Sequence, residues 1–362
     1  MPAYKLTKNC IWNSFQNSSK KHIIITGNRG IGKSTLLKTL FPNGLPGITT
    51  WAKPGTAVYL KENTTEKITK VGVFDPTLSG TENKMQLYGN GFSTLGMDAL
   101  RNTLQHESEW ISIDEIGYLE SKCPDYLDMI THIMEQKHVI AVVRKQNLSH
   151  LKNLCTGEDA FLIDLDAPFK DMGCVIMASG MGKRFGENKL MTDFNGRPLI
   201  SYILDAAFGL FKKCVVVTRH EEVAKLCKQR NVDVILHTLP HRNDTIRLGL
   251  EKMLEMEHCM FCTADQPLLQ KDTIVSLALL SVNTPHKIVR PIFSTTPGSP
   301  VIFPRWTFED LLHLPEGLGG GYIIKQHPES ITYLPITNSY ELEDIDTRDD
   351  FIQLQKKACS SH

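Results

Sequence analysis

The sequence predicts two consecutive α/β domains, each built on a mainly parallel sheet covered by helices. At 362 residues the chain is about twice the length of a common single domain. Short apolar runs alternate with longer helical segments, and this alternation stops once and then restarts, as expected for two series of strand–helix crossovers. Hydrophobic residues make up 41% and charged residues 22% of the chain, which is typical of a globular protein.

Composition also limits the expected partners and the compartment. Lys plus Arg total 40 and Asp plus Glu total 40, so no net field favours nucleic acid or a membrane surface, and we expect neither as a partner. No secretory signal pattern and no apolar run of bilayer length is present, and the nine cysteines are scattered, which indicates a reduced, cytoplasmic protein. One CxxC spacing, Cys259 to Cys262, lies in an apolar run and is interpreted as strand packing.

The first series of apolar runs begins near Lys21. Its expected strands lie at 22–26, 110–113, 138–143 and 161–165, and a helix is expected at 33–40. Between the first two strands, residues 58–76 contain two strand-like runs on either side of the polar turn 62–67. This stretch predicts a β-hairpin insertion.

A domain boundary is expected near residues 168–172. Pro168 ends any regular element there, and a new apolar run begins at Gly173. We therefore predict one domain at 1–170 and a second at 171–362. In the second, strands are expected at 174–177, 214–218, 233–236 and 259–263, with helices near 198–210 and 221–229.

A glycine-rich loop follows the first expected strand. Residues 27–34 read GNRGIGKS and satisfy the phosphate-loop pattern GxxxxGK[ST] between a strand and a helix. Glycines allow backbone N–H groups to close around phosphate at a helix N-terminus, Lys33 faces the β- and γ-phosphates, and Ser34 faces Mg²⁺. The predicted site for ATP or GTP consists of Gly27, Gly30, Gly32, Lys33, Ser34 and Thr35.

Two carboxylates end the strand at 110–113. Asp114 is expected to hold the metal's water shell and Glu115 to polarise the attacking water. The loop, the hairpin and the string DEIGYLE at 114–120, which ends in Glu120, together resemble a small nucleoside-triphosphatase family over residues 21–166. The sequence leaves open whether Arg144 faces the γ-phosphate or solvent. A nucleotide kinase is the alternative, although no basic lid is evident.

A second glycine-rich loop follows the strand at 174–177. Residues 178–189 read ASGMGKRFGENK and resemble the nucleotidyltransferase signature AAGxSxRFGxxK, with Ser179 and Gly182 as departures. In that family the glycines wrap a triphosphate, and an arginine and a lysine neutralise its charge. The resemblance implies nucleotide binding by Ala178, Gly180, Gly182, Arg184 and Lys189.

Four further segments resemble elements of nucleotidyltransferases, in the same order along the chain. Most of them match the branch of cytidylyltransferases that acts on the molybdenum cofactor. Residues 242–250 resemble RxDSVxxGL and contribute Asp244 and Thr245 to the nucleotide site, while 264–267 read ADQP and place Asp265 at a metal. Residues 298–303 match GxPxxF beside the acceptor, and 344–350 resemble DIDTxED, of which Asp346 is the second expected metal ligand. The family's GDxGxR is replaced by EGLGGG at 316–321.

The two resemblances imply a P-loop NTPase followed by a Rossmann-like nucleotidyltransferase. The implied reaction is Mg²⁺-dependent transfer of CMP from CTP, or another NTP, to a phosphorylated acceptor, which in the resembled branch is molybdopterin or its metal-loaded form. A molybdenum enzyme is then a possible client. The predicted catalytic residues are Lys33, Glu115, Arg184, Lys189 and Asp265, and the predicted metal ligands are Ser34, Asp114, Asp265 and Asp346.

Two other functions remain open on the sequence. The P-loop domain could be a nucleotide-driven switch in a delivery protein whose second half only binds cofactor. Alternatively, the second half could be a sugar- or alditol-phosphate nucleotidyltransferase, because RxDSV is shared with an isoprenoid-pathway cytidylyltransferase. Pyrophosphate release separates the first alternative from catalysis.

Overall fold

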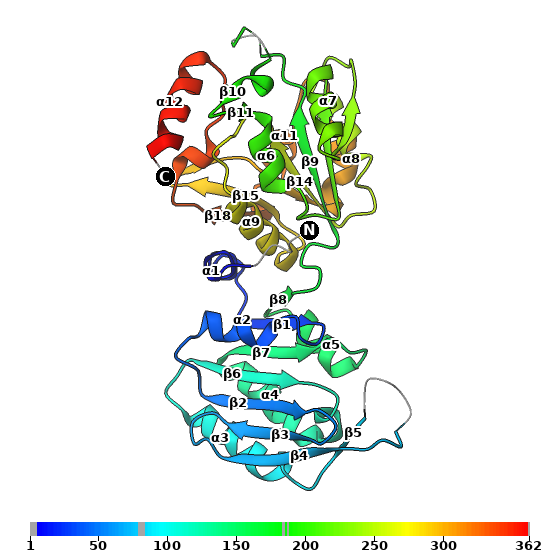
Figure 1. The fold of residues 1–362 in the computed structure, drawn as a ribbon, viewed down its shortest axis with the longest axis vertical. Helices are drawn as coiled ribbons and strands as arrows, with labels where there is room; N and C mark the ends of the chain where they lie inside the picture. The colour runs from blue at the N-terminus through cyan, green and yellow to red at the C-terminus, as the bar shows by residue number, and fades with distance from the viewer. Residues whose placement is uncertain (1–5, 79–83, 183–184, 187, 361–362) are drawn as a thin grey trace. The chain divides into compact units, whose positions relative to one another are not determined.

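The computed structural model divides the chain into two compact units, Ser19–Pro168 and Phe169–His362, the second of which also includes the residues up to Ser18. It describes residues 6–78, 84–182, 185–186 and 188–360. Among these, no helix has the length and apolar character needed to cross a membrane. Figure 1 shows the elements of each unit.

The N-terminal unit contains an eight-stranded sheet in the order β5-β4-β3-β2-β6-β7-β1-β8. Its strands are β1 (His22–Gly27), β2 (Gly47–Lys53), β3 (Ala57–Glu62), β4 (Ile68–Phe74), β5 (Met85–Leu87), β6 (Trp110–Ile116), β7 (His138–Arg144) and β8 (Ala160–Asp164). Strands β2, β6, β7, β1 and β8 pair in parallel, whereas β3, β4 and β5 extend the sheet in antiparallel fashion. The antiparallel pair β3–β4 is the hairpin that the sequence predicts.

Helices and helical turns of this unit are α2 (Lys33–Leu40), η1 (Phe92–Gly96), α3 (Met97–Gln105), η2 (Glu120–Lys122), α4 (Pro124–Gln136) and α5 (Ser149–Thr156). Strand β1 is buried along its whole length. Ile24 belongs to the core cluster that includes Leu100 of α3, Ile130 of α4 and Leu151 of α5. Because side chains alternate along a strand, Ile23 and Ile25 face the opposite side of the sheet. The P-loop therefore follows directly after a strand that is buried on both faces of the sheet.

The C-terminal unit contains a second eight-stranded sheet, in the order β13-β12-β9-β14-β17-β15-β16, with β18 paired to β15. Its strands are β9 (Met172–Ala178), β12 (Lys213–Thr218), β13 (Asp233–Leu236), β14 (His258–Thr263), β15 (Ile288–Phe293), β16 (Thr296–Pro297), β17 (Val301–Pro304) and β18 (Ile331–Pro335). Strands β13, β12, β9 and β14 are parallel, and β17 lies antiparallel between β14 and β15. A small ribbon pairs β10 (Asp193–Phe194) with β11 (Arg197–Pro198).

Helices α6 (Ile200–Ala207), α7 (Glu221–Gln229), α8 (Arg242–Leu250), α9 (Lys271–Asn283), α10 (Phe308–Leu312), α11 (Gly321–Gln326) and α12 (Arg348–Ser360) belong to the same unit. Shorter turns are η3 (Lys189–Met191), η4 (Arg305–Thr307), η5 (Pro328–Ser330) and η6 (Ser339–Leu342). The α/β fold class predicted from the sequence is confirmed for both halves. Cys259 and Cys262 are fully buried in β14, as strand packing requires, and none of the cysteines in the described part of the chain forms a disulfide.

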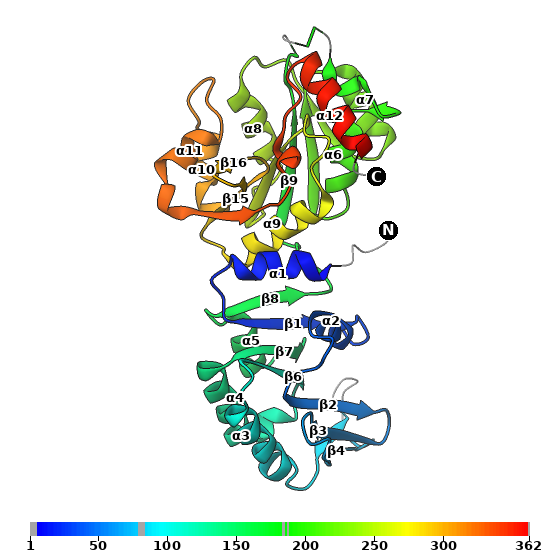
Figure 2. The same ribbon diagram turned by 90° about the vertical axis from the view of Figure 1, so that its left-hand side faces the viewer.

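The first helix, α1 (Lys8–Gln16), belongs to the C-terminal unit. The predicted N-terminal domain at 1–170 therefore included residues that the structure places in the other unit. Figure 2 shows α1 beside α9. Cys10 and Ile11 are buried, and the Ser14 hydroxyl donates a hydrogen bond of 2.8 Å to the carbonyl of Ser276. The helix buries its apolar side on a partner more than 250 positions away, so local sequence pattern carries no sign of the assignment.

Candidate active sites

The P-loop is positioned by strand β1 and helix α2. Gly32, the residue before α2, has a φ of 105°, a conformation that side chains of L-residues rarely adopt. A Cβ at Gly27 would lie 3.0 Å from Cγ2 of Ile31 and 3.3 Å from Cβ of Leu165, so the loop packs too closely there for a larger residue. The two glycines keep backbone N–H groups open at the N-terminus of α2, where anions are stabilised.

Lys33 and Ser34 begin α2, and their side chains contact the P-loop backbone and Asp114. The Lys33 ammonium is buried and donates hydrogen bonds of 2.9 Å to the carbonyl of Gly27 and 3.0 Å to that of Asn28. The Ser34 hydroxyl donates a hydrogen bond of 2.9 Å to Oδ1 of Asp114. Burial raises the pKa of Asp114, although the bond from Ser34 opposes the rise. A hydroxyl beside a buried carboxylate is a suitable pair for a hard divalent cation.

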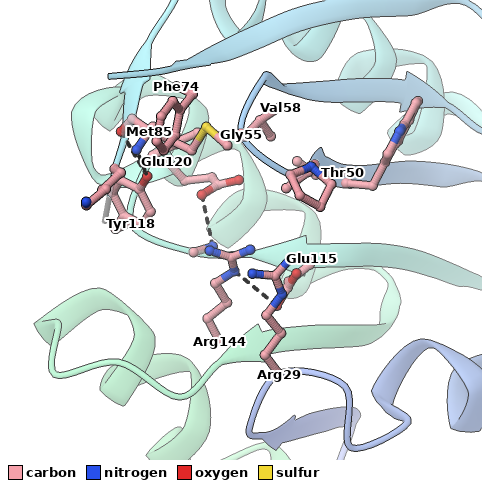
Figure 3. Close-up of a pocket in the computed structure, with 16 residues that line it drawn as sticks. Arg29, Thr50, Gly55, Val58, Phe74, Met85, Glu115, Tyr118, Glu120 and Arg144 are labelled. Carbon is pink, nitrogen blue, oxygen red and sulfur yellow. Dashed lines mark hydrogen bonds and ion pairs between the residues drawn. The ribbon is translucent and has the colours of Figure 1, made fainter. Parts of the chain in front are cut away.

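Glu115 lies between two cations. Its Oε1 is 3.9 Å from Nζ of Lys33 and 3.1 Å from Nε of Arg144. Figure 3 shows Arg29 and Arg144 beside Glu115. Arg144, which the sequence left open between the γ-phosphate and solvent, thus pairs with the predicted water-polarising carboxylate. Strand β6 continues past both carboxylates to Ile116, two residues beyond Asp114.

The other predicted residues of the N-terminal site lie in the P-loop, on helix α2 and in the turn η2. Gly30 has a φ of 80° within the loop, and Thr35 is exposed in the first turn of α2. Glu120 is buried and accepts a hydrogen bond of 2.9 Å from the N–H group of Gly117. Burial raises the pKa of Glu120 to about 7. Glu120 therefore holds a proton over part of the neutral range.

The second site is a cavity of about 630 Å³ at the carboxyl ends of β9 and β14, which we call the nucleotide cavity. Ligands of open parallel sheets bind at this edge, and the volume is in the range of small-molecule sites. The predicted residues that line it are Ala178, Gly180, Gly182, Lys189, Thr245, Asp265 and Asp346. Arg184 lies outside the described residues.

Lys189 joins the two carboxylates that the sequence assigns to one metal. Its ammonium lies 2.7 Å from Oδ2 of Asp265 and 3.1 Å from Oδ1 of Asp346, and it also donates to the carbonyl of Ile345. Burial disfavours the charged form of Lys189, but the charges and hydrogen bonds of the two aspartates outweigh it and raise its pKa. Asp265 and Asp346 therefore converge on a single positive charge, within the reach of two short hydrogen bonds.

The chemistry of this group suits Mg²⁺. Oδ1 of Asp265 is buried and has no hydrogen-bond partner, which leaves one carboxylate oxygen available to a cation. The pKa of neighbouring Asp344 is raised to about 6 by loss of solvent around its carboxyl group and by the charges of Asp265 and Asp346. No cluster of three or more His, Cys, Asp or Glu side chains in the described chain forms a closed metal cage. Mg²⁺ commonly takes one or two carboxylates and completes its shell with phosphate and water.

Asp244 and Thr245 take different positions at the start of α8. The Asp244 carboxylate accepts a hydrogen bond of 3.0 Å from the N–H group of His241 and caps the helix, and it does not line the nucleotide cavity. Thr245 is buried and lines the cavity. A nucleotide contact by Asp244 stays a prediction, and its position in the structure is that of a capping residue.

Sequence reasoning missed several groups of the cavity. Arg219 follows strand β12, lines the cavity and donates a hydrogen bond of 3.0 Å to the carbonyl of Ser179. Ser179 is also bound from the β13 side, because the Nε2 atom of His237 lies 2.8 Å from its hydroxyl. Arg219 had a usable signal, since it comes directly after an expected strand, at the edge where ligands bind. His237 had none.

The glycine run at 317–321 closes a neighbouring cavity of about 350 Å³, which we call the acceptor cavity. A Cβ at Gly319 would lie 3.0 Å from Nε of Arg242, and one at Gly320 would lie 2.8 Å from Cζ of Phe303. Gly319 and Gly320 therefore pack their backbone against an arginine and an aromatic ring, where a larger residue would not fit. Arg242 and Met177 line both cavities, so the two are adjacent.

Two protein families match the chain. Residues 58–172 match an NTPase family, beginning after the P-loop, and residues 174–331 match the MobA-like NTP transferase domain. Each match covers less than half of the chain, and the two matches follow each other in the order that the sequence predicts.

Individual proteins match the chain at low sequence identity. A probable molybdenum cofactor guanylyltransferase of Aquifex aeolicus is 28% identical over 103 residues, which are 28% of this chain and 50% of that protein. The chain therefore spans about half the length of this relative. Among solved structures, Rv0371c of Mycobacterium tuberculosis is 18% identical with a TM-score of 0.44, covering 52% of this chain and 98% of its own. Molybdopterin-guanine dinucleotide biosynthesis protein A of Archaeoglobus fulgidus is 18% identical with a TM-score of 0.42, covering 53% and 100%.

Proposed function

We propose that this chain is a bifunctional enzyme of cofactor maturation. Its C-terminal unit transfers a nucleotidyl group from an NTP to a phosphorylated acceptor of the molybdopterin type, and its N-terminal unit hydrolyses ATP or GTP. The single observation that carries the transferase proposal is the convergence of Asp265 and Asp346 on Lys189 in the nucleotide cavity. The free cysteines fit a reducing cytoplasm, where a molybdenum enzyme would be the client.

The proposed transfer depends on positioning and charge. Backbone N–H groups of the loop that includes Gly180 and Gly182 hold the triphosphate, and Lys189 neutralises charge at the α-phosphorus. Mg²⁺, when held by Asp265 and Asp346, neutralises phosphate oxygens. An oxygen of the acceptor phosphate attacks the α-phosphorus, the bond to the β-phosphate oxygen breaks, and pyrophosphate leaves with the electron pair. The attacking phosphate is already anionic at neutral pH, so no side-chain base is needed.

The acceptor cavity supports a ring-bearing acceptor. Its walls include the apolar side chains of Phe261, Val301 and Phe303, and Arg290 and Lys325 supply positive charge. It adjoins the nucleotide cavity at Arg242, so an acceptor phosphate and a nucleotide α-phosphate can meet there. A heterocycle that carries a phosphate, such as molybdopterin, matches this combination of apolar walls and cations.

The base of the nucleotide is proposed as cytosine, because the ADQP and DIDT strings resemble the cytidylyltransferase branch. The Aquifex relative is named a guanylyltransferase, which makes GTP the competing donor. A direct comparison of the two nucleotides decides between them.

The experiment incubates the whole protein with molybdopterin, Mg²⁺ and each NTP in turn, and follows pyrophosphate together with the mass of the dinucleotide product. The proposal expects product from CTP at least about tenfold faster than from GTP. The reverse order would reassign the base. If no NTP yields pyrophosphate although ATP is hydrolysed, the chain is a nucleotide-driven delivery protein and the transferase proposal fails.

For the N-terminal unit, the contacts support hydrolysis. Ser34 and Asp114 would provide oxygen ligands to Mg²⁺, and Lys33 neutralises negative charge on the β- and γ-phosphates. Glu115 orients the attacking water, and Arg144 holds Glu115 in place and adds positive charge at the γ-phosphate.

A further inference from the structure

The N-terminal unit contains a cavity that is larger than hydrolysis requires. It has a volume of about 210 Å³ and lies between the β2–β3 hairpin, Met85, the end of strand β6 and Arg144. We call it the hairpin cavity. Arg29, from the P-loop itself, also lines it. The P-loop, strands β2 to β4 and the end of strand β6 thus line one cavity.

The hairpin cavity opens on the γ-phosphate side of the P-loop. Lys33 marks that side, since the lysine of a P-loop contacts the β- and γ-phosphates. Glu115 lies 3.9 Å from Nζ of Lys33 and is itself part of the cavity lining. A molecule in the cavity would therefore have its polar end next to the position of the γ-phosphate.

Size and walls indicate an organic occupant. A water molecule occupies about 30 Å³, so the cavity holds far more than the one water that hydrolysis consumes. Trp51, Val58, Phe74 and Met85 give it apolar walls. The Trp51 ring stacks on Tyr59 with a centroid distance of 5.7 Å, which fixes an aromatic surface at the edge. Apolar walls of this extent favour a ring-sized body over water.

The polar groups gather at one end. Figure 3 shows Arg29, Arg144 and Glu115 together, with Phe74, Met85 and Tyr118 at the other end of the cavity. Arg144 holds the Glu115 carboxylate at 3.1 Å, so that carboxylate is fixed in orientation. Glu120, buried beside them, offers a proton near neutral pH. Apolar walls with a few convergent polar groups are typical of a substrate site.

We propose that the hairpin cavity binds a second substrate, a small molecule with a hydroxyl group on an apolar, ring-sized body, and that the N-terminal unit transfers the γ-phosphoryl group to that hydroxyl. The hydroxyl oxygen forms a bond to the γ-phosphorus, and the bond from that phosphorus to the β–γ bridging oxygen breaks. The nucleoside diphosphate leaves with the electron pair, and the hydroxyl proton passes to Glu115. Hydrolysis is the same displacement with water in place of the alcohol.

Benzyl alcohol is a suitable probe, because it carries one hydroxyl on one aromatic ring. The full-length protein is incubated with Mg²⁺, γ-labelled ATP and increasing benzyl alcohol, and labelled benzyl phosphate is separated from inorganic phosphate. We expect benzyl phosphate to rise to a plateau while inorganic phosphate falls. The measured quantity is the ratio of ester to inorganic phosphate, which does not depend on the amount of folded enzyme.

Ala52→Phe places a ring in the cavity and is expected to lower this ratio by about tenfold. Leu87→Phe, at an exposed position outside the cavity, is the matched control and should keep the parent ratio. Inorganic phosphate without ester, at a rate that benzyl alcohol does not change, would overturn the inference and leave the proposed hydrolysis standing. An equal ratio in Ala52→Phe and the parent would also overturn it. Absence of both products would overturn hydrolysis and transfer together.

Discussion

The ammonium group of Lys189 lies 2.7 Å from a carboxylate oxygen of Asp265, which is 76 positions later in the chain. Oδ1 of Asp346 lies 3.1 Å from the same ammonium nitrogen. Three segments thus meet at the Lys189 ammonium: a turn after the glycine-rich loop, the end of strand β14 and the loop before α12. Two carboxylates held this close without a cation between them would repel each other, so the Lys189 ammonium stabilises their arrangement.

Replacement of Lys189 tests both of its roles. Lys189→Met removes the charge and leaves the two aspartates unneutralised, so the transferase rate should fall at least about a hundredfold. Melting temperature in the absence of metal should fall, and added Mg²⁺ should restore more of it than in the parent, because the cation takes over the neutralisation. Calorimetry with and without Mg²⁺ and a pyrophosphate assay measure both effects. Lys228→Met, on helix α7, is the control. An equal Mg²⁺ effect in Lys189→Met and the parent would contradict the stabilising role.

Replacement of Lys33 tests whether the two sites work separately. Lys33→Ala removes the charge that faces the β- and γ-phosphates, so ATP or GTP hydrolysis should fall at least about a hundredfold. Pyrophosphate release by the C-terminal unit should stay within about twofold of the parent, since its residues form a separate compact unit. Both products are measured in one reaction. Lys152→Ala, at an exposed position of α5, serves as the comparison. Loss of both activities in Lys33→Ala would show that the sites are coupled.

Acid stability is predicted from His258. This residue is buried at the start of β14, its Nδ1 lies 3.0 Å from the Ser281 hydroxyl, and burial lowers its pKa from 6.5 to about 4. The folded state thus takes up the proton less readily than the unfolded state. Its neutral form contributes stability that is full above pH 6.5 and is lost as the pH falls toward 4.

Between pH 7.5 and 5, the free energy of unfolding of the C-terminal unit should fall by about 2 kcal/mol more in the parent than in His258→Gln. Urea unfolding at the two pH values measures the difference. His313→Gln, an exposed histidine of the same unit, should behave as the parent. A parallel fall in His258→Gln and the parent would exclude His258 as the cause.

Much of each site was predictable because its signals are local. The P-loop occupies eight consecutive positions between a buried strand and a helix, and Asp114 and Asp265 come where parallel strands reach their carboxyl ends. Such patterns need no knowledge of distant contacts. They predict which residues meet at a site edge, as for Ser34 with Asp114.

The remaining features depend on packing between distant segments. Helix α1 finds its partner α9 across most of the chain, and no local pattern reveals that contact. Lys189 was predicted at the α-phosphate, whereas its position between Asp265 and Asp346 depends on three loops that meet only in the folded unit. The helix-capping contact of Asp244 with the His241 N–H group was not predicted, and its nucleotide contact stays a prediction.

The Mg²⁺ dependence of pyrophosphate release tests the central claim most directly. The rate is measured with CTP and molybdopterin over a range of Mg²⁺ concentrations, in the parent, in Asp265→Asn and in Asp346→Asn, with the exposed Asp349→Asn of helix α12 as control. The account predicts that each of the two site variants loses at least about a hundredfold in rate at low Mg²⁺, while Asp349→Asn follows the parent. Parent-like rates in Asp265→Asn and Asp346→Asn at every Mg²⁺ concentration would contradict it.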